Sequence, residues 1–232
     1  MAGLCAVVFD LDDTLYDAFT QCVRPAQREA AEAMRRAGLR APLEAIVALR
    51  EALAGAPLDL DEEVARSFPC SDPQAVARAG RAAFLVRDPG ALSPHPFARE
   101  VLLAVRARAQ AVLLTAGHPP TQQAKLARLG LGDLLDPQLW VDPARGQAKA
   151  GVLGAWLAQS GLPAAQVLVV GDRPAAEIAA ARALGCPALR IRAGECAGQP
   201  TPAGVQEAAD IRAVLAWLEG PCPPCGEAAP GR

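Results

Sequence analysis

The stretch LCAVVFDLDDTL, residues 4–15, decides the fold that we expect for this chain, because an unbroken apolar run ends in a cluster of carboxylates. A short continuous apolar run of this kind is typical of a strand that is buried on both faces of a parallel sheet. Two further runs, AVLL at 111–114 and QVLVV at 166–170, are each followed by a turn and a helix-like segment. This alternation predicts an α/β fold, a doubly wound parallel sheet with helices on both faces.

Weaker runs at 139–141 and 187–191 bring the expected sheet to about five strands, which is a usual size. A last helix is expected from about Val205 to Glu219.

Residues 17–92 interrupt the alternation. They contain helical stretches at 21–37, 42–54, 61–68 and 73–84, and no convincing strand. We therefore predict a Rossmann-like core formed by residues 1–16 and 93–220, with residues 17–92 as an inserted α-helical cap domain.

The Pro- and Gly-rich end, residues 221–232, is expected to be a disordered tail. Its Cys222 and Cys225 form a CxxC pair, but a zinc site would need two more ligands nearby.

Composition narrows the class of protein. The formal net charge of the 232-residue chain is −2, so no basic field favours nucleic acid as a partner. The seven cysteines are odd in number and irregularly spaced, which fits a reduced, cytoplasmic protein. The first apolar run is too short for a signal peptide or a spanning helix, so no membrane partner is expected.

Polar side chains follow the three main runs at the point where each would end as a strand. Asp10 and Asp12 follow the first, Thr115 the second and Asp172 the third. A single Asp after a strand is often only a turn residue or a helix cap. In an open parallel sheet, however, ligands bind beyond the carboxyl ends of the strands. Clustered carboxylates repel one another unless a cation lies between them, so the pattern favours a divalent cation.

Lysine is rare in this chain: of 23 basic residues, only Lys125 and Lys149 are lysines. A lysine is a compact point charge suited to a phosphoryl oxygen. Lys149 is the first candidate for that role and Lys125, inside the helical stretch QQAKLARLG, is the alternative. A solvated surface position remains the other interpretation of each.

Four segments in order, FDLDDTL (9–15), LLTAG (113–117), Lys149 and VVGDRPAAEI (169–178), resemble the motifs of the haloacid dehalogenase-like (HAD) hydrolase superfamily. The resemblance covers about residues 4–195 and is to the phosphatase branch with a helical cap inserted after the first motif. It implies a Mg²⁺-dependent phosphatase that hydrolyses a small phosphorylated metabolite, a phosphate monoester, through an aspartyl-phosphate intermediate.

The resemblance also implies roles for single residues. Asp10 would be the nucleophile, Asp12 the general acid and base, and Asp172 a Mg²⁺ ligand together with Asp10 and the backbone carbonyl of Asp12. The remaining expected roles are phosphate binding by Thr115, Ala116 and Lys149, and support by Thr14 and Glu177.

Departures from the family pattern occur at Ala116, where Asn is common, at Glu177, where Asp is common, and at Ala150, where Pro is frequent. None removes a group that the reaction requires. Asp12 disfavours carbon–halogen cleavage, which needs no proton donor at that position. A phosphomutase and a catalytically silent phosphatase-like binding module remain alternatives, and the sequence leaves the natural substrate and the oligomeric state open.

Overall fold

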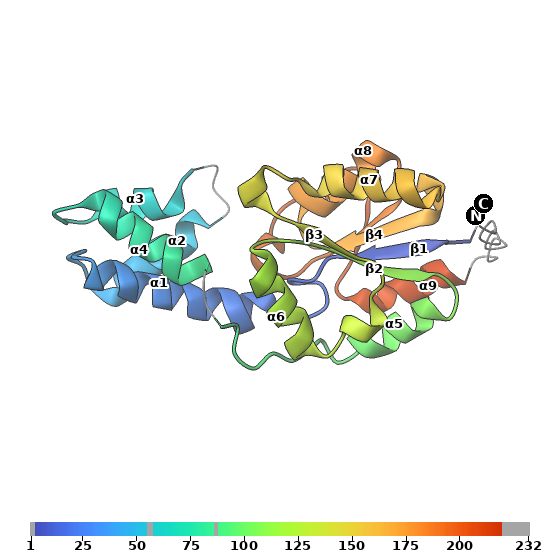
Figure 1. Cartoon of the computed structure of the whole chain (residues 1–232), viewed down its shortest axis with the longest axis horizontal. Helices are drawn as coiled ribbons and strands as arrows, with labels where there is room; N and C mark the ends of the chain where they lie inside the picture. Colours follow the sequence, from blue (N-terminus) through green and yellow to red (C-terminus); the bar gives the residue numbers. More distant parts are fainter. Residues whose placement is uncertain (1–2, 55–57, 86–87, 220–232) are drawn as a thin grey trace, which may run out of the picture. The chain divides into compact units, whose positions relative to one another are not determined.

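The computed structural model describes residues 3–54, 58–85 and 88–219 (Figure 1). They form two compact units, one made of the chain before Ala18 together with the chain from Ser93 onward, the other of Ala18–Leu92. The predicted tail at 221–232, with its CxxC pair, lies outside the described residues.

The first unit is built on one parallel sheet of six strands in the order β3-β2-β1-β4-β5-β6. The strands are β1 Ala6–Phe9, β2 Gln110–Ala116, β3 Gln138–Val141, β4 Val167–Gly171, β5 Ala188–Ile191 and β6 Gln206–Ala208.

Helices cover both faces of this sheet, with α7 and α8 on one side and α5 and α9 on the other (Figure 1). The helices of this unit are α5 Ala98–Arg106, α6 Pro119–Leu129, α7 Lys149–Ser160, α8 Ala179–Leu184 and α9 Val214–Leu218, and a π-helical turn, Pro174–Ile178, precedes α8.

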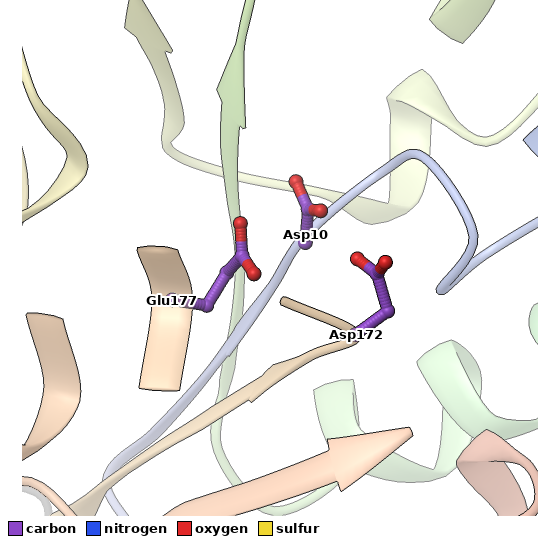
Figure 2. A group of neighbouring side chains, drawn as sticks. All are labelled: Asp10, Asp172 and Glu177. Carbon is purple, nitrogen blue, oxygen red and sulfur yellow. The ribbon is translucent and has the colours of Figure 1, made fainter. Parts of the chain in front are cut away.

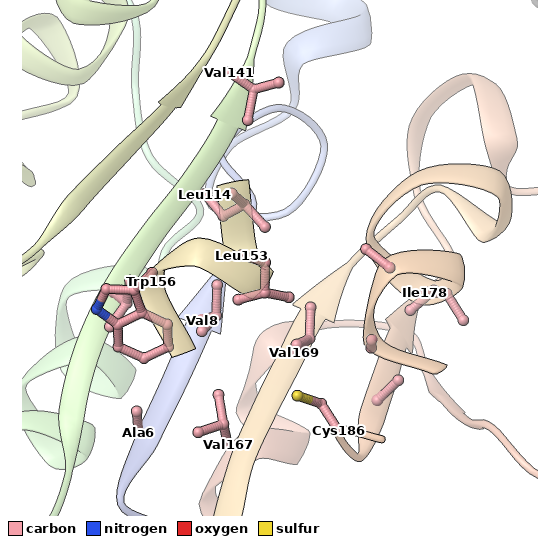
Figure 3. Close-up of a cluster of buried hydrophobic side chains, with 14 residues drawn as sticks. Ala6, Val8, Leu114, Val141, Leu153, Trp156, Val167, Val169, Ile178 and Cys186 are labelled. Carbon is pink, nitrogen blue, oxygen red and sulfur yellow. The ribbon is translucent and has the colours of Figure 1, made fainter. Parts of the chain in front are cut away.

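The central strands are fully buried because both of their faces lie against helices. In β1, Ala6 and Val8 contact the layer that contains Leu153 and Trp156 of α7 (Figure 3). Successive side chains of a strand point to opposite faces, so Val7 and Phe9, also fully buried, face the other layer. This two-sided burial explains the continuous apolar run from which the fold was predicted.

The predicted α/β fold with a parallel sheet is confirmed, whereas the predicted helix from about Val205 to Glu219 is wrong at its start. That segment begins with strand β6, and α9 starts only at Val214. The strand is three residues long, pairs with β5 at the edge of the sheet and has mostly exposed side chains. Since its side chains are not buried, it lacks the apolar pattern by which the other strands were recognised.

The second unit consists of helices packed around their own apolar core, which includes Met34, Ile46, Val64 and Val76. Its helices are α1 Arg24–Arg36, α2 Leu43–Leu53, α3 Leu60–Ser67 and α4 Pro73–Leu85, and a π-helical turn, Phe19–Val23, precedes α1.

No helix among the described residues is both long enough and apolar enough to cross a membrane.

Candidate active site

The register of the sheet brings the predicted site residues to one edge. Phe9 of β1 pairs with Leu113 of β2 and with Val170 of β4. Asp10, one residue beyond Phe9, donates its backbone N–H to the Val170 carbonyl at 2.9 Å. Asp172 follows β4 at the same carboxyl end, so strands more than 150 residues apart in sequence place two carboxylates side by side.

A tight loop follows Asp10. Asp13 has a positive φ of 53°, a left-handed conformation that Asp tolerates better than most side chains. Beyond it, Leu15 donates its N–H to the Leu11 carbonyl at 3.0 Å. The loop thereby brings Tyr16 back alongside Asp12, with which it forms an isolated bridge.

Three buried carboxylates meet at this edge: Asp10 after β1, Asp172 after β4 and Glu177 from the π-helical turn (Figure 2). One oxygen of each lies within 4.8 Å of the others. Both oxygens of Asp172 are buried and accept no hydrogen bond from the described residues. A buried carboxylate without a donor is costly, and a hard cation that prefers oxygen ligands would relieve that cost. The residues present therefore fit Mg²⁺.

Lys149, the first residue of α7, lies against two of these carboxylates. Its ammonium donates to Asp10 at 2.6 Å and also to Glu177. Burial disfavours the charged amine, but the two carboxylates outweigh this effect and raise the pKa of Lys149. The second oxygen of Glu177 accepts the Arg173 N–H at 3.1 Å, so Glu177 holds the amine in place beside Asp10.

The pKa values of the carboxylates reflect their crowding. Burial is the main cause that raises the pKa of Asp10 to about 7; Lys149 opposes the rise and Glu177 adds to it. Burial, followed by repulsion from Asp10 and Glu177, raises the pKa of Asp172 to about 8. The ionised forms of Asp10 and Asp172 are therefore destabilised in this site, and a divalent cation would offset that destabilisation.

We predict that Mg²⁺ raises the melting temperature of the wild type, and that Asp172→Asn removes this increment. In EDTA at neutral pH the variant should melt about 2–4 °C above the wild type for a gain of about 1 kcal/mol, since the amide does not carry the cost of burial that raises the pKa of Asp172. Differential scanning calorimetry with and without Mg²⁺ measures both effects, with exposed Asp133→Asn as the matched control. A full Mg²⁺ increment in Asp172→Asn would place the metal elsewhere.

Asp12 lies outside this cluster and has its own set of donors. Tyr16 donates its hydroxyl to Asp12 at 2.5 Å, Gln122 donates its amide at 3.1 Å, and the Lys125 ammonium contacts both carboxylate oxygens at 2.8 and 2.9 Å. Burial favours a higher pKa, but the ion pair with Lys125 and these hydrogen bonds outweigh it and lower the pKa of Asp12.

The sequence reasoning missed Gln122 altogether and considered Lys125 only for phosphate. A signal was available, because the two residues lie three apart on one face of a helix that starts three residues after strand β2. The first turns of such a helix lie over the carboxyl end of the sheet. The two lysines thus take different partners, Lys149 with Asp10 and Lys125 with Asp12.

The other predicted residues lie nearby with more local contacts. Thr115 is buried and its hydroxyl accepts from Gln122 at 2.9 Å, while the Ala116 carbonyl accepts from the same amide at 3.0 Å. Thr14 is fully buried, and its hydroxyl has no hydrogen-bond partner among the described residues.

A cavity of ≈ 550 Å³ in the first unit opens onto this site. Asp10, Asp12 and Lys149 line it together with Arg173 and Glu177. Most of the remaining wall consists of alanines, many of them from α7, α8 and the turn before α8, so much of the lining is apolar. A small ligand with an anionic group that contacts Lys149 and Arg173 fits this lining.

Comparison with known proteins gives one family match and many similar folds. A family model described as haloacid dehalogenase-like hydrolase matches residues 5–185. No curated protein matches the chain.

Among solved structures, magnesium-bound YfnB from Bacillus subtilis has a TM-score of 0.67 at 14% identity and covers 94% of this chain and 99% of its own. SP0104 from Streptococcus pneumoniae has a TM-score of 0.66 at 20% identity, with coverages of 93% and 99%. The L-2-haloacid dehalogenase from Xanthobacter autotrophicus with chloropropionic acid covalently bound has a TM-score of 0.58 at 18% identity, with coverages of 94% and 99%. At these identities the structures establish a shared fold.

Proposed function

The chain belongs to the haloacid dehalogenase-like hydrolases, and from this premise we propose that it is a Mg²⁺-dependent phosphatase acting on a small phosphate monoester. One observation carries the proposal: Asp10 and Asp12 line the same cavity, two residues apart, and each is held by its own lysine. A hydrolase that attacks phosphorus with one carboxylate needs a second one to move the proton.

In the proposed reaction an Asp10 oxygen forms a bond to phosphorus while the ester P–O bond breaks, and Asp12 gives its proton to the leaving alcohol oxygen. Water then attacks phosphorus of the aspartyl-phosphate, and Asp12 takes its proton. Inorganic phosphate leaves, and both carboxyl groups return to their starting states. Asp12 therefore alternates between acid and base within one turnover.

Lys149 supports this chemistry through its charge. Its ammonium lies 2.6 Å from Asp10, where it neutralises the charge of the nucleophile. Once the aspartyl-phosphate has formed, the same ammonium would neutralise the charge of the phosphoryl oxygens. Asp10, Asp172 and the backbone carbonyl of Asp12 would hold Mg²⁺, with Glu177 as support. When bound, Mg²⁺ supplies charge neutralisation for an anionic substrate. Thr115, the Ala116 backbone and Thr14 complete the proposed phosphate site.

The helical unit, residues 18–92, has the role of a substrate-selecting cap in this proposal. It forms its own core and contributes no residue to the three-carboxylate cluster. Selection among phosphate esters by a separate unit would leave the chemistry of the core unchanged.

The test is release of inorganic phosphate from a panel of small phosphate monoesters by the wild type, in Mg²⁺ and in EDTA. We expect turnover of at least one ester in Mg²⁺ and its loss in EDTA. A parallel arm measures halide release from 2-haloacids, for which we expect none.

Each contrary result indicates a different function. Halide release without phosphate release would show a dehalogenase. Isomerisation of a sugar phosphate with little phosphate release would show a phosphomutase. Binding of phosphate esters without turnover would show a binding module.

A further inference from the structure

We propose that Gln122 and Lys125, on helix α6, are positioning residues that aim the Asp12 carboxylate at the reacting oxygen. This inference rests on the proposed phosphatase function and concerns how its proton-transfer group is held. It also assigns Lys125 a role different from the phosphate contact considered from the sequence.

Three side chains hold Asp12 from two elements. Tyr16, in the same loop, donates its hydroxyl to Oδ1 at 2.5 Å. From α6, Gln122 donates to Oδ2 at 3.1 Å, and Lys125 contacts Oδ1 at 2.9 Å and Oδ2 at 2.8 Å. Each oxygen thus has at least two donors, which fixes the rotation of the carboxyl group about both of its side-chain bonds.

The amide of Gln122 has one orientation that satisfies its neighbours. Its nitrogen lies within 3.1 Å of three acceptors, which are Asp12 Oδ2, Thr115 Oγ1 and the Ala116 carbonyl. Turning the amide over would place its oxygen against the carboxylate and the carbonyl, which cannot donate. The oxygen has no hydrogen-bond partner among the described residues. The side chain therefore ties Asp12 to the end of β2.

Lys125 reaches Asp12 from a mostly buried position. Its side chain is 13% exposed and that of Asp12 is 27% exposed, so the pair is shielded from solvent at one end and open to the cavity at the other. A surface ion pair would contribute little to stability or geometry. This pair joins the end of the nucleophile loop to α6, across 113 residues of sequence.

Loss of the contacts that Gln122 and Lys125 make with Asp12 has a specific chemical consequence. A proton-transfer group must lie within hydrogen-bond reach of the atom that it serves, and a freely rotating carboxylate meets that condition for a smaller fraction of time. A leaving group whose oxygen stabilises negative charge poorly depends most on proton transfer from Asp12. Alkyl phosphates should therefore suffer more than aryl phosphates, while substrate binding should change less than kcat because Thr115 and Lys149, the proposed phosphate-binding side chains, are themselves unchanged.

The experiment compares kcat and KM of Gln122→Ala, Lys125→Met and Lys125→Arg for a series of alkyl and aryl phosphates with leaving groups of graded acidity, in saturating Mg²⁺. Gln123→Ala, the same substitution at the neighbouring exposed position, is the matched control. We expect kcat for alkyl phosphates to fall by roughly 10- to 100-fold in the first two variants, with KM within about twofold of the wild type. For aryl phosphates kcat/KM, which reports the bond-breaking step and not the later hydrolysis of the intermediate, should fall about threefold or less.

Further outcomes separate positioning from simple stability. Lys125→Arg should recover part of the lost kcat, and Gln123→Ala should match the wild type. If Gln122→Ala is poorly folded, Gln122→Asn keeps an amide that is one methylene too short to reach Asp12 and should show the same selective loss.

Equal losses of kcat/KM on alkyl and aryl esters, or unchanged kcat in well-folded variants, would overturn the positioning role while leaving the phosphatase proposal intact. A wild type without activity on any ester would instead contradict the proposed function itself.

Discussion

Asp10→Asn is expected to lower kcat for phosphate release by roughly 10⁴-fold or more, because an amide oxygen cannot replace the carboxylate that forms the covalent intermediate. The side chains have nearly the same size, so contacts with Lys149 and the cavity wall should largely persist. Phosphate release measured with the best ester from the panel checks this, and trapping of labelled phosphate on the wild-type chain at low pH identifies the intermediate.

Folding of the variant provides the necessary control. Since burial and Glu177 outweigh the attraction of Lys149 and raise the pKa of Asp10, the neutral amide should not lower the melting temperature. Asp133→Asn, at an exposed position far from the three carboxylates in sequence, should keep wild-type activity. Substantial turnover by folded Asp10→Asn would mean that another group attacks phosphorus or that water does so directly.

Asp61→Ala is expected to lower the free energy of unfolding of the helical unit by about 3–5 kcal/mol, because it leaves the guanidinium of Arg50 buried without its counter-ion. Arg50 is 1% exposed and donates to Asp61 at 2.6 Å and to Gln27 at 2.7 Å. Gly80 of α4 lies so close that a Cβ there would come within 2.8 Å of the Asp61 carboxylate, which leaves little room for water to enter.

The distribution of tryptophan allows the two units to be followed separately. Trp140, Trp156 and Trp217 all lie outside residues 18–92, so tryptophan fluorescence reports on the first unit, whereas far-ultraviolet circular dichroism reports on the helices of both. In urea, Asp61→Ala should shift the dichroism transition to lower concentration and leave the fluorescence transition in place.

Two further variants test the cause. Glu62→Ala breaks an exposed ion pair with Arg66 on the same helix and should cost less than about 1 kcal/mol. Arg50→Met combined with Asp61→Ala should recover much of the loss, because an apolar side chain of similar length needs no counter-ion. A loss in Asp61→Ala as small as that in Glu62→Ala would show that the buried pair adds little.

The parts of the fold that were predictable from sequence are those in which burial leaves a pattern. Strands β1, β2 and β4 lie between two layers of helices, so their residues are apolar without alternation. Strand β6 carries no such pattern because it is short and exposed. The burial of Arg50 was equally unpredictable from the sequence. In the sequence ALREAL it resembles a solvated charge on a helix, and only the packing of α2 against its neighbours buries it.

For the site, the apolar runs placed the carboxylates at strand ends but did not pair Lys125 with Asp12. The polar residues after β1 and β4 meet because parallel strands end at one edge, which follows from the fold alone. The pairing of Lys125 with Asp12, and of Lys149 with Asp10, depends on where α6 and α7 begin and on which face each lysine lies. The spacing of Gln122 and Lys125 indicates that they share a helix face, but side-chain packing decides which carboxylate each lysine contacts.

The location of the two lysines restricts where a reagent that modifies side-chain amines can react with this chain. Lys125 and Lys149 are the only lysines in the sequence, so both of its side-chain amines lie beside the carboxylates of a single cavity. A reagent that acylates amines, which would modify many scattered positions on an ordinary protein, has only these two side chains to react with here. Intact mass would then count the acyl groups added, and peptide mapping would separate the two lysines from the α-amino group, which also reacts. Slower lysine labelling in the presence of a ligand would show that the ligand occupies the cavity.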